Sequence, residues 1–232
     1  MKRTFLDKLA AWKTNPNRKP LIIKGARQVG KTYLLHQFGS EYFPNYHYFN
    51  FEQQEELARI FTLNLDPSRI IEELEVHQNR KIDSINDLVV FDEIQACPRA
   101  LTSLKYFQEK MPNLAIASAG SLLGIHLGPV SFPVGKVDFL TLYPMSFEEF
   151  LFACEGDRSL KLLKLHSRIP ELVHEHLWNQ LKLYFIVGGL PEIVAIFCQH
   201  KDNLLTAFQE VRAKQSALIL AYYADIAKHS GK

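Results

Sequence analysis

Short apolar runs alternate, through about residue 145, with longer segments whose apolar residues recur at three- and four-residue spacing. The short runs predict β-strands and the longer segments predict helices, an alternation typical of a parallel sheet flanked by helices. The third and fourth runs are continuously apolar, as expected for strands that helices cover on both faces. The predicted strands are 21–24, 47–51, 88–91, 114–118 and 137–142. The predicted helices are 31–38, 55–61 with 68–76, 100–110 and 121–127.

The pattern changes near residue 146. Ser146 and Glu149 form the S-x-x-E capping box that predicts the start of a helix. Residues 159–183 are helical in pattern, and "VGGLPE" then ends one helix and begins another, because glycine frees the backbone and proline suits a first helical turn. No strand-like run follows. We therefore expect two domains, an α/β core over residues 1–145 and a helical part over residues 146–232.

Composition narrows the class of protein. The chain has 232 residues and 47% hydrophobic content, enough for a sizeable core. Its 27 Lys and Arg against 25 Asp and Glu give no electrostatic footprint of a dedicated nucleic-acid binder. No apolar run approaches the ~18 residues that span a bilayer, and charges interrupt the place where a signal peptide has its apolar core. We expect a soluble, cytoplasmic protein without a membrane partner.

The three cysteines give no sign of a bonded framework. Cys97, Cys154 and Cys198 lie far apart and show no C-x-x-C spacing. The sequence therefore predicts neither a disulfide framework nor a zinc site, and it fits a reducing compartment.

The segment "GARQVGKT" matches G-x-x-x-x-G-K-[ST] and lies where a predicted strand ends and a predicted helix begins. Glycines let successive backbone N–H groups point inward at a polyphosphate, and the following helix adds its N-terminal dipole. The lysine would reach the β- and γ-phosphates, and the threonine hydroxyl would ligate Mg²⁺. The predicted nucleotide-binding residues are Gly25, Ala26, Arg27, Gln28, Val29, Gly30, Lys31, Thr32 and Tyr33.

The buried run "LVVF" leads into Asp92 and Glu93. Open α/β sheets bind ligands at the carboxyl ends of their strands, so both carboxylates are expected beside the phosphate loop. Asp92 is predicted to hold the Mg²⁺ by orienting a water bound to it, and Glu93 to activate the attacking water as a general base. Such a pair favours hydrolysis over transfer of the phosphoryl group to a small molecule. Gln95 follows closely, but no mechanism requires it.

The fourth predicted strand also ends in polar residues. Ser118 and Ser121 lie where a polar side chain would contact the γ-phosphate or the catalytic water. Ser121 is equally suited to cap the next helix. The sequence does not decide between the two serines.

Five segments together resemble an uncharacterised, predominantly prokaryotic group of AAA+-superfamily ATPases: "GARQVGKT", "VVFDEIQACPRAL", "SAGSLLG", "FPVGKVDFLTLYPMSFEEFL" and "YFIVGGLPEIV". The resemblance spans nearly the whole chain. It implies a P-loop NTPase core with a parallel five-stranded sheet in the order 5-1-4-3-2, a helical lid, and adenine as the base. In that group a further C-terminal domain follows a segment like "YYADIAK", so we expect the present chain to be a fragment.

The resemblance also implies an arginine that reaches the γ-phosphate bound by a neighbouring subunit. At its expected place the chain has Lys136, which offers a point charge in place of a planar fork. Arg99 is a second candidate. Either residue is also consistent with an ordinary surface charge.

The predicted function is an ATP-binding, Mg²⁺-dependent ATPase that acts on an unidentified protein or nucleic-acid client, as a homo-oligomer or with a partner that supplies the activating residue. The alternative is a nucleotide-gated switch or scaffold that binds ATP and hydrolyses it little. A small-molecule kinase fits less well, because residues 146–200 contain only Arg158 and Arg168. The chain has no N-K-x-D element, which would read guanine.

Overall fold

The computed structural model describes residues 3–121, 135–164 and 170–230. The chain folds into two compact units. We call the described part of Phe5–Tyr143 the sheet unit, and the described residues from Pro144 onward, with Arg3 and Thr4, the helical unit. The assignment of the predicted domains as a nucleotide-binding core and a lid stays a prediction.

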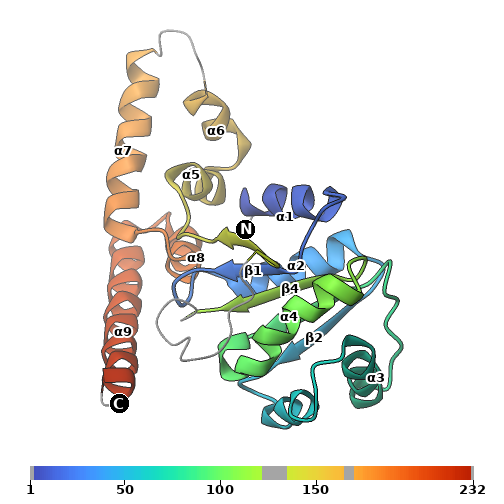
Figure 1. Cartoon of the computed structure of the whole chain (residues 1–232). Coiled ribbons are helices and arrows are strands. Elements are labelled where there is room, and N and C mark those ends of the chain that lie inside the picture. Colours follow the sequence, from blue (N-terminus) through green and yellow to red (C-terminus); the bar gives the residue numbers. More distant parts are fainter. Residues whose placement is uncertain (1–2, 122–134, 165–169, 231–232) are drawn as a thin grey trace. The chain divides into compact units, whose positions relative to one another are not determined.

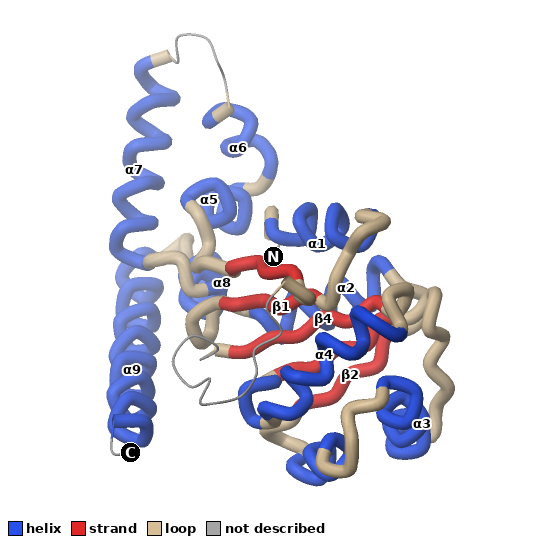
Figure 2. The backbone as a smooth tube through the Cα atoms, in the orientation of Figure 1, coloured by secondary structure: helices blue, strands red, loops and turns tan. Residues whose placement is uncertain are grey.

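Five parallel strands form the sheet in the order β2-β3-β4-β1-β5 (Figures 1 and 2). Read from the other edge this is 5-1-4-3-2, so the predicted fold class is confirmed. Strands β3 and β4 are buried at every residue, as expected for strands that helices cover on both faces. The strands are β1 (Leu21–Lys24), β2 (Tyr46–Asn50), β3 (Leu88–Asp92), β4 (Ala115–Gly120) and β5 (Asp138–Thr141).

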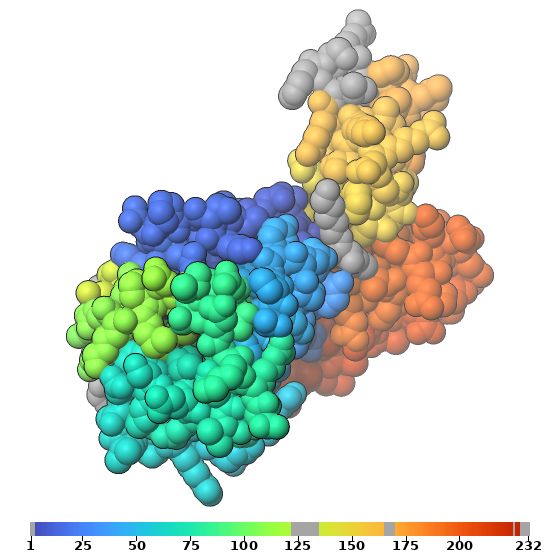
Figure 3. All heavy atoms as spheres, turned by 90° about the vertical axis from the view of Figure 1, so that its right-hand side faces the viewer, coloured from blue at the N-terminus to red at the C-terminus, as the bar shows by residue number. Residues whose placement is uncertain are grey.

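Helices cover both faces of the sheet. On one face α4 crosses the strands in Figure 1, and its apolar side joins η1, α3 and the sheet in one core. Figure 3 shows the atoms of η1, α3 and α4 as one continuous surface. On the other face α1 and α2 bury aromatic and aliphatic side chains. The helices of the sheet unit are α1 (Phe5–Thr14), α2 (Lys31–Tyr42), the 3₁₀-helix η1 (Glu55–Phe61), α3 (Pro67–Gln78), the 3₁₀-helix η2 (Ile94–Ala96) and α4 (Pro98–Lys110).

Every secondary-structure element described in the helical unit is a helix. The predicted capping box is present: the Glu149 backbone N–H donates to Ser146 Oγ over 3.3 Å, and the Ser146 N–H donates to Glu149 Oε2 over 3.1 Å. The predicted break at "VGGLPE" is also confirmed. The helices are α5 (Phe147–Glu155), α6 (Asp157–Leu163), α7 (Glu171–Val187), α8 (Pro191–His200) and α9 (Leu204–Ser230).

The helical stretch 159–183 is divided between α6 and α7, and Pro170 stands at the α7 N-cap. The predicted helix 121–127 lies outside the described residues apart from its first residue. Among the described residues, no helix is both long and apolar enough to cross a bilayer.

The expectation of no disulfide was wrong. Cys154 and Cys198 form one between α5 and α8, with their Cα atoms 5.1 Å apart. The two residues are 44 positions apart and share no motif, so only the packing of α5 on α8 brings them together. Cys97 is free and buried, and burial raises the pKa of its thiol. Cytoplasmic localisation stays a prediction.

Glu149 anchors the helical unit electrostatically. Besides the capping box, its Oε1 accepts hydrogen bonds from the Thr4 N–H (2.8 Å) and Thr4 hydroxyl (2.9 Å), and it lies 3.1 Å from Arg3 Nε. Burial alone would raise the pKa of Glu149, but these donors and the arginine hold it below its ordinary value. The ionised side chain therefore contributes to stability.

We expect Glu149→Ala to lower the free energy of unfolding by about 3–5 kcal/mol at neutral pH, because it removes the carboxylate from a buried ion pair with Arg3. Because the folded-state pKa is depressed, this contribution is present above about pH 4.3 and is lost as the pH falls through the lower folded value. Urea unfolding followed by circular dichroism measures both effects. The control is Glu148→Ala, whose exposed ion pair with Lys164 spans 3.8 Å. It should cost at most about 0.5 kcal/mol; equal losses in the two variants would contradict the account.

Candidate functional site

The loop between β1 and α2 passes close to the end of β5. The Leu142 N–H donates to the Lys24 carbonyl over 2.7 Å, and a Cβ added at Gly25 would lie 2.4 Å from the Leu142 carbonyl oxygen. Such a contact with backbone leaves no room for a side chain, so position 25 requires glycine. Gln28 and Gly30 have φ angles of 64° and 94°. Left-handed residues within such a loop are typical of concave nests of N–H groups that bind anions.

Helix α2 begins directly after this loop. Its N-cap, Gly30, is left-handed and supplies no side-chain hydrogen bond to the first turn. The N–H groups at a helix start lack intrahelical acceptors, and the helix dipole favours negative charge there. Among the flanking residues, Val29 is buried and holds the loop to the core, whereas Tyr33 is 58% exposed. The start of α2 therefore has the features of an anion site.

Lys31 lies within the curve of the loop. Its side chain is only 6% exposed, and its Nζ donates to the carbonyl oxygens of Gly25 (2.9 Å) and Ala26 (2.8 Å). Burial lowers the pKa of Lys31, Glu93 and Asp92 act in the opposite direction, and Arg27 adds to the lowering. The negative charges of both carboxylates thus stabilise the charged form of the Lys31 ammonium.

Asp92 joins the end of β3 to the start of α2. Its Oδ2 accepts hydrogen bonds from the Thr32 hydroxyl (2.7 Å) and the Tyr48 hydroxyl (2.8 Å), and its Oδ1 accepts one from the Glu93 N–H (3.0 Å). The side chain is 1% exposed. The structure therefore brings together the two predicted metal residues, which lie 60 positions apart in the chain.

Tyr48 and Asn50 belong to this cluster and were missed from the sequence. The Tyr48 hydroxyl accepts from Asn50 Nδ2 (3.1 Å), and Asn50 Oδ1 accepts from the N–H groups of Glu52 and Gln53. Burial, together with the hydrogen bond to Asp92, raises the pKa of Tyr48, which therefore remains a neutral donor. The register of β2 and β3 pairs Asn50 with Asp92, and no local pattern in the sequence shows this pairing.

Glu93 follows Asp92 in a left-handed conformation, with φ 48° and ψ 44°. Gln95 Nε2 donates to its Oε2. Burial raises the pKa of Glu93, and the charges of Asp92 and Glu52 add to this, while Gln95 and Lys31 oppose it. A carboxylate whose pKa is raised is a stronger base than an ordinary glutamate.

The two serines occupy different environments. Ser118 lies within β4 and pairs with Ile22 and Phe91; its Oγ is buried and has no hydrogen-bond partner among the described residues. Ser121 follows Gly120, which pairs with Lys24 directly before the phosphate loop. The register thus sets Ser121, rather than Ser118, level with the start of that loop.

The two candidate trans-acting cations lie in different parts of the sheet unit. Lys136 precedes β5 and so stands at the amino end of that strand, opposite the edge that carries Asp92; its Nζ pairs with Glu109 over 3.1 Å. Arg99 lies in the first turn of α4, and its Nε donates to the Phe61 carbonyl oxygen. Their role toward a neighbouring subunit stays a prediction.

The donor set suits Mg²⁺. Within the described residues no three His, Cys, Asp or Glu side chains cluster to hold a metal ion. Mg²⁺ does not need such a cage, because it keeps several waters and binds one or two protein oxygens together with substrate phosphates. The bonded pair of Thr32 and Asp92 offers a hydroxyl and a carboxylate of this kind.

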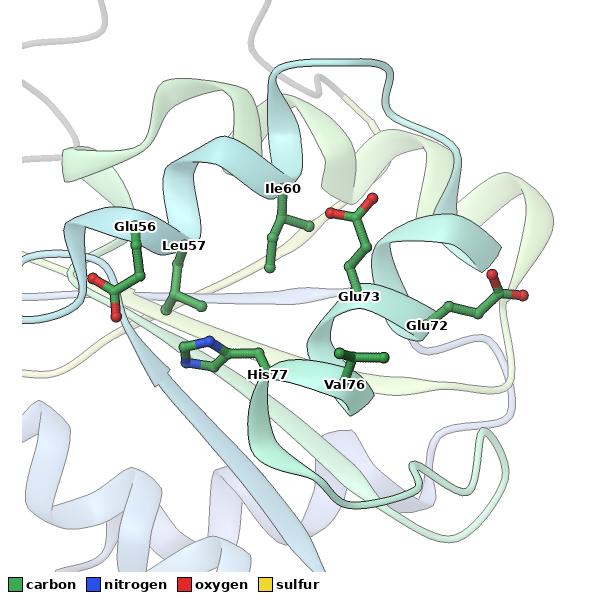
Figure 4. Close-up of a pocket in the computed structure, with 7 residues that line it drawn as sticks. All are labelled: Glu56, Leu57, Ile60, Glu72, Glu73, Val76 and His77. Atoms are coloured by element: carbon green, nitrogen blue, oxygen red, sulfur yellow. The ribbon is translucent and has the colours of Figure 1, made fainter.

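A separate cavity of about 510 Å³ opens between η1 and α3. Figure 4 shows acidic, imidazole and aliphatic side chains from both helices around it. None of its lining residues belongs to the phosphate loop or the acidic pair, so it is not the predicted nucleotide site. The lining residues are Glu56, Leu57, Ile60, Glu72, Glu73, Val76 and His77.

Solved structures of other proteins share the fold of this chain. The Walker-type ATPase PABY2304 of Pyrococcus abyssi superposes with a TM-score of 0.61 at 18% identity, covering 97% of this chain and 75% of that one. PCH-2 of C. elegans gives a TM-score of 0.53 at 14% identity, covering 91% and 67%. No curated protein sequence matches the chain. The family model described as "AAA domain" matches residues 17–151, more than half of the chain, and the chain therefore belongs to the AAA domain family.

Proposed function

We propose that this protein is an ATP-binding, Mg²⁺-dependent ATPase that couples hydrolysis to a macromolecular client. The observation that carries the proposal is the 2.7 Å hydrogen bond from the Thr32 hydroxyl to Asp92. A hydroxyl that donates to a carboxylate keeps its oxygen lone pairs for a metal. This bond therefore holds two oxygen ligands, the Thr32 hydroxyl and the Asp92 carboxylate, next to each other. Membership of the narrower prokaryotic group, and adenine as the base, are part of the same proposal.

Different residues of the chain would bind the polyphosphate and the metal. Gly25–Thr32 would wrap the polyphosphate with backbone N–H groups, aided by the dipole of α2. Lys31 would exchange its two loop carbonyls for β- and γ-phosphate oxygens, which are stronger partners because they are charged. When bound beside Thr32 and Asp92, Mg²⁺ would neutralise charge that develops on the phosphates.

Glu93 is proposed as the general base. It lies next to Asp92 at the carboxyl edge of the sheet, where the loop and α2 also meet. It would accept a proton from the water that attacks the γ-phosphorus. Ser121, level with the loop, is proposed to contact the γ-phosphate, and Ser118 is the weaker of the two candidates because its hydroxyl lies in the core.

A neighbouring subunit or partner protein is proposed to complete the site. Lys136 stands at the opposite edge of the sheet from its own phosphate loop, so it would act only on a nucleotide held by another chain. A cation supplied in trans raises phosphoryl-transfer rates by about 10³–10⁵ in NTPases that use one. Turnover per molecule would then increase with protein concentration.

The function is tested by ATP turnover and ATP binding in two variants. We expect Lys31→Ala to weaken ATP binding, because the only loop ammonium is removed. Glu93→Gln should retain binding but lower turnover by about 10²–10⁴-fold, because the amide cannot take the proton. Coupled-assay kinetics and calorimetric titration measure the two quantities. The control Glu72→Gln, an exposed glutamate on α3, should leave both unchanged. A wild type that binds ATP but is no faster than Glu93→Gln at any protein concentration would instead identify a nucleotide-gated switch.

The metal assignment is tested by Thr32→Val, which keeps the shape of the side chain and removes the hydroxyl. We expect the Mg²⁺ concentration for half-maximal turnover to increase by at least about tenfold, whereas Thr32→Ser should remain near the wild type. Removal of Mg²⁺ with a chelator should abolish turnover in every variant. An unchanged Mg²⁺ requirement in Thr32→Val would contradict the assignment.

A further inference from the structure

The short helix η2 fixes the residues on either side of Ile94. Ile94 is fully buried in the core of the sheet unit, and the Ala96 N–H donates to the Glu93 carbonyl over 2.9 Å. Gln95 is thereby held next to Glu93 by packing and backbone bonding, and its own side chain is not needed for that placement. The local fold therefore does not explain the hydrogen bonding of the Gln95 side chain.

The amide of Gln95 has a defined orientation. Its Nε2 donates to Glu93 Oε2, and the flipped amide would set two acceptor oxygens against each other. Its Oε1 is consequently directed elsewhere, where it is buried and has no hydrogen-bond partner among the described residues. A buried, unpaired acceptor is costly and calls for an explanation.

Glu93 shows the complementary gap. Within the described part of the chain, its carboxylate accepts a side-chain hydrogen bond only from Gln95, at Oε2. Its Oε1 is therefore left to accept a proton. Glu93 Oε1 and Gln95 Oε1 are two acceptors on adjoining side chains, and a water molecule has two hydrogens to donate.

We propose that Gln95 is a positioning residue that orients the attacking water between its own Oε1 and Glu93. The proposal rests on the ATPase function proposed above. The water oxygen forms the new bond to the γ-phosphorus, and the bond from that phosphorus to the bridging oxygen breaks with its electron pair left on ADP. One water hydrogen passes to Glu93 as a proton. The other, held by Gln95 Oε1 during attack, remains on the inorganic phosphate.

The test compares kcat and the KM for ATP in the full chain with Mg²⁺. Gln95→Met keeps the length of the side chain without its hydrogen bonds, and Gln95→Asn keeps the amide but is one methylene short. We expect both to lower kcat by at least about tenfold with the KM for ATP within about twofold of the wild type. Calorimetric ATP binding confirms that each variant is folded.

The matched control is Gln37→Met. Gln37 also donates to a glutamate, Glu41, over 2.9 Å, and its Oε1 is likewise buried without a partner, but it lies beyond the first turn of α2. Its kcat should equal that of the wild type. In a Glu93→Gln background, Gln95→Met should lower kcat by no more than about twofold further, because no base remains for the water to face.

The outcomes separate the two proposals. If Gln95→Met matches the wild type while Glu93→Gln is slow, the role of Gln95 is overturned and the ATPase function stands. Equal losses from Gln95→Met with and without the Glu93 carboxylate would also overturn it, because they indicate a structural effect. If the wild type is no faster than Glu93→Gln, the ATPase function fails and the role of Gln95 fails with it.

Discussion

The hydrogen bond between Thr32 and Asp92 is the constraint on which the site depends. It joins the first turn of α2 to the last residue of β3, two elements that are separated by the whole of β2, η1 and α3 in the chain. Parallel strands make this possible, because the carboxyl ends of β1 and β3 open at the same edge of the sheet. Tyr48 then closes the cluster from β2, so three elements hold one carboxylate.

This arrangement concentrates charge in the interior. Lys31 and Asp92 are almost fully buried, and Glu93 has a raised pKa because of its burial. Buried ionised groups are costly unless they are hydrogen-bonded, and here Lys31 and Asp92 each take part in at least two hydrogen bonds. Near these residues, Ser118 Oγ and Gln95 Oε1 are buried without a hydrogen-bond partner in the described part of the chain. An unpaired acceptor beside the proposed base is the kind of local cost that functional sites retain.

Much of the sheet unit could be predicted from its sequence, because buried strands, a glycine-bounded loop and an acidic pair each leave a local pattern. The strand that leads into Asp92 and the loop ending at Thr32 were found in this way. Tyr48 and the Cys154–Cys198 disulfide were not, because their partners lie 44 positions away in each case and depend on packing that no local pattern encodes. The two serines were distinguished only by the register of β4 against β1.

The most direct measurement is a crystal structure of Glu93→Gln with Mg²⁺ and ATP, since this variant should bind nucleotide without consuming it. The account predicts the triphosphate on Gly25–Thr32, Lys31 on the β- and γ-phosphates, and the metal in contact with the Thr32 hydroxyl on the side facing Asp92. A nucleotide bound elsewhere, as in the cavity between η1 and α3, or a metal that does not contact Thr32, would contradict it.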